Sequence, residues 1–134
     1  MIAIAERGLA NNQTCEAIVL PDTVRVISKS AFTLDVNLKF IHLGSFLERI
    51  GDNAFNGCNS LEFVKPPDGM QEIGINVFAN AKVIKYIEIP ASVTEITDVF
   101  YFKASNNPDV EIRKPKGSKA EEVAKAMGLK VVND

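Results

Sequence analysis

Residues 47–61 read LERIGDNAFNGCNSL, and this stretch carries the pattern that decides the fold. Within it, Ile50 ends a short extended run, Phe55 follows an alanine, and Leu61 completes the unit. The same spacing of apolar residues returns 23 residues before and 23 residues after it. The stretch is therefore one unit of an internal repeat, and such a repeat must be identified before single helices or strands are assigned.

Five columns of residues keep their apolar character at this spacing. One column is isoleucine at every step, and the others hold large apolar side chains at nearly every step. The columns are Ile4, Ile27, Ile50, Ile73 and Ile96; Ile18, Ile41, Val64, Ile87 and Val110; Leu9, Phe32, Phe55, Phe78 and Tyr101; Cys15, Leu38, Leu61 and Ile84; and Met1, Val24, Leu47, Met70 and Val93. The period falls in the range of roughly 20–29 residues that is typical of leucine-rich repeats.

Each unit predicts two short strands and a coil. Ile41 and Leu43 alternate with Phe40 and His42, which indicates a strand with one buried face. The pattern returns at 63–65, 86–89 and 110–112, and a second extended run follows at 24–27, 47–50, 70–73 and 93–96. The coil then places Phe32, Phe55 or Phe78 in the core. A single turn cannot bury its own apolar side, so the turns must stack around a shared core.

This pattern resembles the BspA-like leucine-rich repeats, also called the Treponema pallidum type. Residues 47–61 carry most of the family pattern, hydrophobic-x-x-Ile-Gly-x-x-Ala-Phe-x-x-Cys-x-x-Leu-x-x-Ile-x-Ile-Pro, and the prolines at 21 and 90 fit its end. The departures are Asp35 and Ala81 at the cysteine position, Gly44 at a proline position, and a degenerate coil at 101–108. The resemblance covers nearly the whole chain.

The predicted fold is an α/β solenoid, mostly β. It is a right-handed leucine-rich-repeat solenoid with four to five 23-residue turns, parallel strands on the concave face and a C-terminal capping helix. We expect one domain over residues 1–134, with repeats in 1–112 and the cap in 113–134.

The C-terminal segment predicts the cap that the open end of a solenoid needs. Ser118 and Glu121 have the spacing of a capping box, and Gly128 ends the helix. Apolar residues recur on one helical face between them, at Ala120, Val123, Ala124 and Met127. Leu129 and Val131 then alternate as a last short strand.

The N-terminus offers no comparable cap. Met1 and Ile4 already occupy repeat columns, so the sequence starts inside a turn. Residues 1–7 also lack the basic start and the apolar core of a secretion signal, as a fragment would. Either the chain was cut from a longer array, which we favour, or another molecule covers this edge. Self-association through the uncapped edge is one form of the second alternative.

The composition argues against several classes of protein. The net charge is −2, with acids and bases interspersed, so we expect no nucleic-acid partner. Apolar runs are much shorter than the ~20 residues that cross a bilayer, so we expect no membrane insertion. Two cysteines and one histidine are too few for a disulfide framework or a zinc site. No cofactor or metal is expected.

Nothing in the sequence favours an enzyme. His42 lies at an outward strand position, where a solvated histidine is commoner than a catalytic base. Cys58 occupies a small buried position as a compact hydrophobe, and Cys15 replaces a column leucine, so both are predicted to lie in the core. They belong to turns about 10 Å apart, too far for a disulfide. Residues 114–118 could hold an anion at the helix N-terminus, although a solvated linker is the simpler interpretation.

The functional clue is a row of aromatic residues on the outward strand face. Phe40, Phe63 and Tyr86 share one column, between Ala17 and Asp109. The next outward column is Val19, His42, Lys65, Glu88 and Glu111. Exposed aromatics among polar neighbours resemble a binding hot spot, so the candidate ligand-binding residues are Phe40, Phe63, Tyr86, His42, Lys65 and Glu88. Alternatively, the rings only stack on one another, which stabilises a sheet by ~0.2–1 kcal/mol per pair and needs no partner.

What the family resemblance implies is a bacterial or protist protein that is secreted or on the cell surface and takes part in adhesion to host matrix proteins and cells. We therefore expect a non-enzymatic protein-binding or adhesion module. The alternative is a structural spacer or stalk with no ligand of its own, and an enzyme ranks third.

Overall fold

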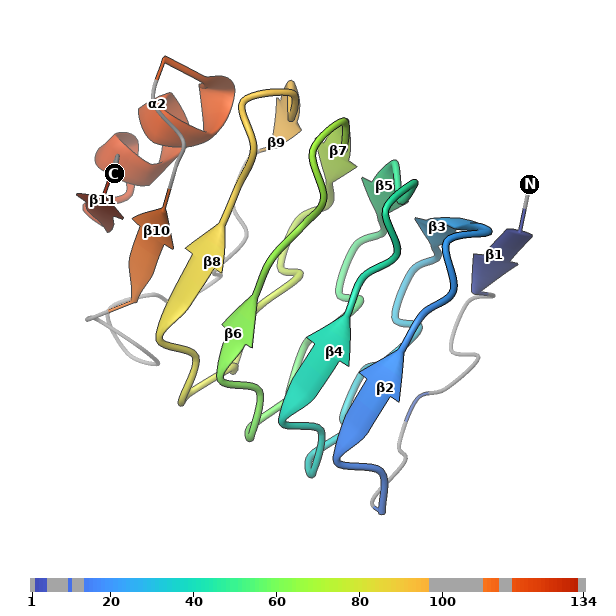
Figure 1. The fold of residues 1–134 in the computed structure, drawn as a ribbon. Coiled ribbons are helices and arrows are strands. Elements are labelled where there is room, and N and C mark those ends of the chain that lie inside the picture. Colours follow the sequence, from blue (N-terminus) through green and yellow to red (C-terminus); the bar gives the residue numbers. More distant parts are fainter. Residues whose placement is uncertain (1, 5–9, 11–13, 97–109, 114–116, 133–134) are drawn as a thin grey trace.

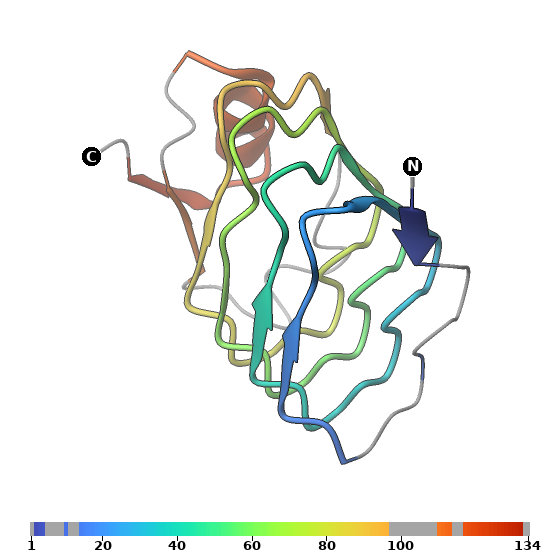
Figure 2. The same ribbon diagram turned by 45° about the vertical axis from the view of Figure 1, so that its right-hand side comes forward.

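The computed structural model describes residues 2–4, 10, 14–96, 110–113 and 117–132. Within them the chain winds as stacked turns between two walls of short parallel strands (Figure 1). Four turns each contribute one strand to each wall. The predicted solenoid is therefore confirmed, with the N-terminal strand at one end of the stack and a helix at the other (Figure 2).

One wall carries the outward-facing columns, and we call it the front wall. Its strands are β2 (Ala17–Val19), β4 (Phe40–His42), β6 (Phe63–Val64), β8 (Tyr86–Glu88), β10 (Glu111–Arg113) and β11 (Lys130–Val132). All pairings in it are parallel. β4 and β6 are neighbours, yet no hydrogen-bonded ladder joins them in the described chain, so the front wall consists of two sheets.

The other wall, the back wall, is one five-stranded parallel sheet. Its strands are β1 (Ile2–Ile4), β3 (Val24–Ile27), β5 (Arg49–Ile50), β7 (Glu72–Ile73) and β9 (Glu95–Ile96). The isoleucine column lies in register through it, from Ile4 and Ile27 to Ile96. The second extended run of each unit therefore forms a strand, as predicted.

The core lies between the two walls and is closed by the aromatic coil residues. Phe32, Phe55 and Phe78 are fully buried and stack on one another, with ring centroids 5.2 and 5.9 Å apart and nearly parallel planes. Burying a side chain of this size stabilises the fold by about 1.5–3 kcal/mol. The stack confirms the predicted aromatic column, and it crosses three successive turns.

Two positions in each coil require left-handed backbone. The first holds Ser30, Asn53 and Asn76, with φ of 57°, 59° and 55°. The second holds Leu34, Gly57 and Asn80, with φ of 62°, 80° and 60°. Glycine and asparagine adopt this conformation with least strain, which explains their recurrence at these steps of the repeat.

The register of β10, the fifth front-wall strand, differs from the prediction. The sequence pattern placed Val110 in the column of Ile87, but Ile112 is the partner of Ile87. That assignment was wrong by two residues, so Glu111 lies opposite Tyr86 and Arg113 opposite Glu88. A slip of two residues keeps the same side chains facing inward, and alternation alone cannot detect it. The column members Leu9 and Tyr101, the degenerate coil at 101–108, Asp109 and most of the 114–118 linker lie outside the described residues.

The predicted cap is confirmed. Helix α2 (Lys119–Ala126) starts at Ser118, whose side-chain oxygen accepts a hydrogen bond from the Glu121 N–H at 3.3 Å. Ala120 and Ala124 are buried against the last turn, and Gly128 leaves the helix with a φ of 73°. β11 then pairs with β10, so the cap also extends the front wall.

Alternating charges line the corner where each turn enters the front wall. Glu16 and Lys39 form an ion pair at 3.0 Å, and Glu62 and Lys85 form another at 3.9 Å. The hydrogen bond to Glu16 raises the pKa of the Lys39 ammonium, and Glu62 adds to this effect from the next turn. Successive turns thus present an acid, a base, an acid and a base at this corner.

Candidate functional site: the front-wall groove

The predicted aromatic row lies on the outward side of the front wall. Its inward neighbours Ile41, Val64 and Ile87 are buried. Phe40 is 43% exposed, while Phe63 and Tyr86 are half-buried. The ring centroids of Phe40 and Phe63 are 5.6 Å apart with planes inclined by 53°, and those of Phe63 and Tyr86 are 5.5 Å apart and nearly parallel. The three rings are therefore accessible and in contact with one another, and Phe63 and Tyr86 are stacked.

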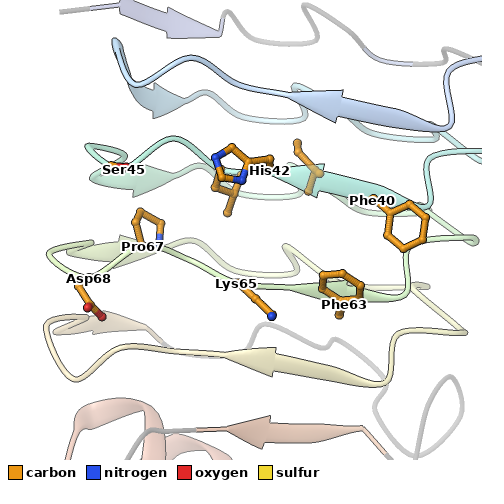
Figure 3. Close-up of a pocket in the computed structure, with 9 residues that line it drawn as sticks. Phe40, His42, Ser45, Phe63, Lys65, Pro67 and Asp68 are labelled. Carbon is orange, nitrogen blue, oxygen red and sulfur yellow. The ribbon is translucent and has the colours of Figure 1, made fainter.

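An open groove of about 660 Å³ crosses the front wall between β4 and β6. Phe40 and Phe63 line one end, Ser45, Pro67 and Asp68 line the other, and His42 and Lys65 lie between them (Figure 3). The side chain of Lys65 also lies over the Phe63 ring, with its Nζ 5.5 Å from the centroid. The groove offers an apolar end for a side chain and polar groups for hydrogen bonds.

The groove collects only some of the predicted site residues. Phe40, His42, Phe63 and Lys65 line it, whereas Tyr86 and Glu88 do not. Sequence reasoning missed the polar end of the groove, which comes from the turns after the strands and is lined by Ser45, Pro67 and Asp68. The available signal was the polar residue at one step of successive repeats, at positions 22, 45 and 68.

A proline shortens the pairing of β6 with β8 beside the groove. Leu20 and Ile89 donate their N–H groups across the wall, to the carbonyls of His42 at 2.9 Å and Arg113 at 3.0 Å. Pro66 occupies the same step of the repeat and has no N–H to donate. β6 accordingly ends at Val64, and the chain beyond it lines the groove.

The C-terminal end of the aromatic row is closed by a guanidinium group. The Cζ of Arg113 lies 3.8 Å from the centroid of the Tyr86 ring. Glu111 holds this arrangement, because its carboxylate accepts a hydrogen bond from Arg113 Nε at 3.0 Å and pairs with Lys130 Nζ at 3.1 Å. The bond to Arg113, followed by that to Lys130, lowers the pKa of the Glu111 carboxyl. The sequence prediction missed Arg113, because it placed Glu111 after Glu88 in the outward column, whereas Arg113 is the residue in register with Glu88.

The two cysteines form no disulfide and lie in different surroundings. Cys58 is buried and its thiol donates to the Phe32 carbonyl at 3.2 Å, which confirms its role as a small core residue. Burial raises the pKa of this thiol to about 12. The prediction that Cys15 lies in the core was wrong, because it is only half-buried and its thiol donates to the Ala17 carbonyl. Its strand neighbour β2 is paired on one side alone among the described strands.

Neither a cluster of metal-binding side chains nor a membrane-spanning helix occurs in the part of the chain that the structure describes. There, no three histidine, cysteine or acidic side chains lie close enough together to hold a metal ion. None of the helices described is long and apolar enough to cross a membrane.

These features define a repeat protein of parallel-strand turns that presents the outer side of a sheet. Residues 2–115 match the family model of the BspA type leucine rich repeat region, in six copies, and the chain belongs to this family. It is similar in structure to the leucine-rich repeat protein of T. pallidum, with 26% identity and a TM-score of 0.80 over 99% of this chain. It also resembles a leucine rich cell surface protein of Faecalibacterium prausnitzii A2-165, with 25% identity and a TM-score of 0.73 over 98% of this chain.

The chain spans 63% of the T. pallidum protein's solved chain and 32% of the Faecalibacterium one. None of the curated proteins matches it.

Proposed function

We propose that this chain is a non-enzymatic binding module whose front-wall groove receives part of a protein partner. The observation that carries the proposal is the groove itself, about 660 Å³ of open space with aromatic rings at one end and polar groups at the other. Interfaces draw most of their binding energy from a few aromatic anchors with polar groups around them. Phe40 and Phe63 have this character, and Lys65 and Asp68 supply opposite charges.

The proposed setting is the cell surface, and the proposed partner class is host matrix or host cell-surface protein. Membership of the BspA type family supports this proposal, as does the similarity to a protein described as a leucine rich cell surface protein. Outward strand positions on stacked repeats form a continuous surface, which suits contact with another macromolecule.

A structural spacer is the second candidate, and the ring contacts favour it. Phe63 stacks on Tyr86 at 5.5 Å, and Arg113 covers the other end of the row. Such contacts stabilise the wall without any partner. In a spacer, replacing Phe63 changes stability alone.

The test is a binding panel of purified matrix proteins, including fibronectin, laminin and collagen, on the immobilised chain. Phe63→Ala should weaken binding most, because this ring lies at the centre of the row, and Phe40→Ala should also weaken it. A central aromatic anchor costs about 2 kcal/mol or more, which is a loss of about 30-fold in affinity.

Phe46→Ala is the matched control, since this ring is 57% exposed and lies outside the groove. Equal affinity of all three variants for every bound protein would refute a groove site. Absence of binding across the panel, with both groove variants still folded, would favour the spacer.

A further inference from the structure

The turn that forms the polar end of the groove contains an Asp-Gly pair. Asp68 lines the groove there, and Figure 3 shows its side chain apart from those of His42 and Lys65. Both Asp68 and Gly69 are exposed. Gly69 has a φ of 92°, and no atom beyond its two chain neighbours lies within 4 Å of the position that a Cβ would take. The peptide bond between the two residues is therefore open to solvent and uncrowded.

The Asp68 carboxylate is not held by the fold. Asp22 occupies the same step of the repeat two turns earlier, and its Oδ1 accepts a hydrogen bond from the Ser45 N–H at 2.9 Å. Within the described ranges, the Asp68 side chain makes no hydrogen bond or ion pair. Its carboxyl carbon is thus free to approach the nitrogen of the next residue. After Asp22 that residue is the β-branched Thr23, whereas a glycine offers the least hindrance.

A second pair of this kind, Asn56-Gly57, is held by the coil. The Asn56 Nδ2 donates to Asn53 Oδ1 at 3.1 Å, and its Oδ1 accepts from Asn80 Nδ2 at 3.2 Å. Gly57 is buried, and its N–H donates to the Ala79 carbonyl at 2.9 Å. The side chain and the following nitrogen are therefore both fixed in this pair, in contrast to the pair in the groove.

One exposed hydrogen bond restrains the nitrogen of Gly69. Its N–H donates to Ser92 Oγ at 3.1 Å, and this hydroxyl donates in turn to the Met70 carbonyl at 2.7 Å. A hydrogen bond in contact with water exchanges with solvent at a small net cost. The bond therefore slows the approach of this nitrogen to the Asp68 carboxyl group and does not prevent it.

We propose that Asp68 is a site of spontaneous modification, at which the aspartate isomerises to isoaspartate. The Gly69 nitrogen attacks Cγ of the protonated Asp68 carboxyl group, the N–Cγ bond forms, and the hydroxyl leaves as water with the proton of the nitrogen. Water then adds to the main-chain carbonyl carbon of Asp68 in the five-membered imide. The bond from this carbon to the Gly69 nitrogen breaks, so the main chain now runs through Cγ. One water is released and one is consumed.

The modification changes the polar end of the groove. It adds one methylene to the main chain between Asp68 and Gly69 and leaves the carboxylate directly on the Asp68 Cα. The turn is closed by a hydrogen bond from the Met70 N–H to the Pro67 carbonyl at 3.3 Å, and it must then accommodate the longer chain. The negative charge is kept, but its position in the groove shifts. The groove therefore changes as the protein ages, without any enzyme.

The test follows the purified full chain during incubation at physiological pH and temperature. Isoaspartate is measured with a methyltransferase specific for its carboxyl group, and it is located by peptide mapping, where the isomerised peptide separates at unchanged mass. Isoaspartate should accumulate at Asp68 with time, while Asp22 and Asn56 stay unmodified. In guanidinium chloride Asn56 should be modified as well, because unfolding removes the hydrogen bonds that hold it.

Two variants test the mechanism. Asp68→Glu keeps the charge and should stay unmodified, because its longer side chain cannot close a five-membered ring. Ser92→Ala should accelerate the modification of Asp68 by up to about fivefold, the size of one exposed hydrogen bond. Modification of Asp22 as fast as Asp68, or of Asn56 in the folded chain, would overturn the inference. So would an Asp68 that is modified only after unfolding. This readout is chemical, so it does not depend on what the groove binds.

Discussion

Among the described residues, Leu34 has the side chain that fits its backbone conformation least well. It has a φ of 62° at a step where later turns carry Gly57 and Asn80. A left-handed conformation costs a residue with a branched side chain about 1–2 kcal/mol, and asparagine less. Leu34→Asn should therefore raise the free energy of unfolding by about 0.5–1 kcal/mol in urea denaturation.

The reverse change, Asn80→Leu, serves as the matched control and should lower stability. If Leu34→Asn instead destabilises the protein, the contact of Leu34 with the coil around Gly57 outweighs the backbone strain.

The stability losses of two phenylalanine variants should distinguish the core column from the front-wall column. Phe55 is fully buried in the coil stack, and Phe63 is half-buried on the front wall. Phe55→Ala should cost ~3–5 kcal/mol, as other truncations of a buried ring do, and Phe63→Ala much less. Chemical denaturation of both variants tests this. A loss below about 1 kcal/mol for Phe55→Ala would contradict its place in the core, and equal losses would make the front-wall ring part of the core.

Cys58 should make stability fall at high pH. Its pKa is raised from 9.0 to about 12, so the folded protein holds this proton where the unfolded chain has lost it. The stabilising effect is complete below pH 9 and is lost as the pH rises from about 9 to 12. Denaturation of Cys58→Ala, which copies Ala81 in the same column, should show a smaller decline over that range. Identical declines would mean that burial does not protect this thiol.

At the scale of single elements, the last strand depends on Glu111. Its lowered pKa means that the carboxylate stabilises the contact between β10 and β11 above pH 4.5, and that this effect is lost as the pH falls below it. The protection factors of the β11 amides, which compare each exchange rate with the intrinsic rate at the same pH, should therefore fall on acidification. Glu111→Gln should lower these protection factors already at pH 7 and reduce their dependence on pH.

Glu122→Gln is the control, because Glu122 pairs only with Lys119 on the exposed face of α2 among the recorded ion pairs. Unchanged exchange in Glu111→Gln would show that Arg113 and Lys130 bind the strand without it.

The elements that could be predicted are those set by the repeat. The Ile50 and Phe55 columns recur at every described turn, so their burial follows from spacing alone. The position of β10 could not be predicted, because a two-residue slip preserves the alternation. The groove was also beyond the sequence pattern, since it depends on where the front wall separates. That separation lies between β4 and β6, and the repeat spacing does not show which neighbouring turns lack a ladder.

At the scale of the whole molecule, the cap should decide whether the array is cooperative. Ala120 and Ala124 pack over Ile96 and Ile112 of the last turn. Deleting residues 117–134 exposes this apolar surface, so the truncated chain should aggregate or lose its single unfolding transition. Light scattering and thermal melting measure both effects. The milder Ser118→Ala change should cost about 1 kcal/mol and keep the protein monomeric. A truncated monomer with an unchanged melting temperature would show that the cap is dispensable.

The alternating corner charges give the array a parity. Acid and base exchange places at each turn, through Glu16, Lys39, Glu62 and Lys85, so the electrostatic unit is two turns although the structural unit is one. Duplicating one turn would bring two like charges side by side, which costs roughly 0.2–1 kcal/mol at a position that otherwise stabilises the stack. Duplicating two consecutive turns preserves every pair. Growth of such an array, by gene duplication or by design, should therefore proceed more easily by even numbers of repeats than by odd ones.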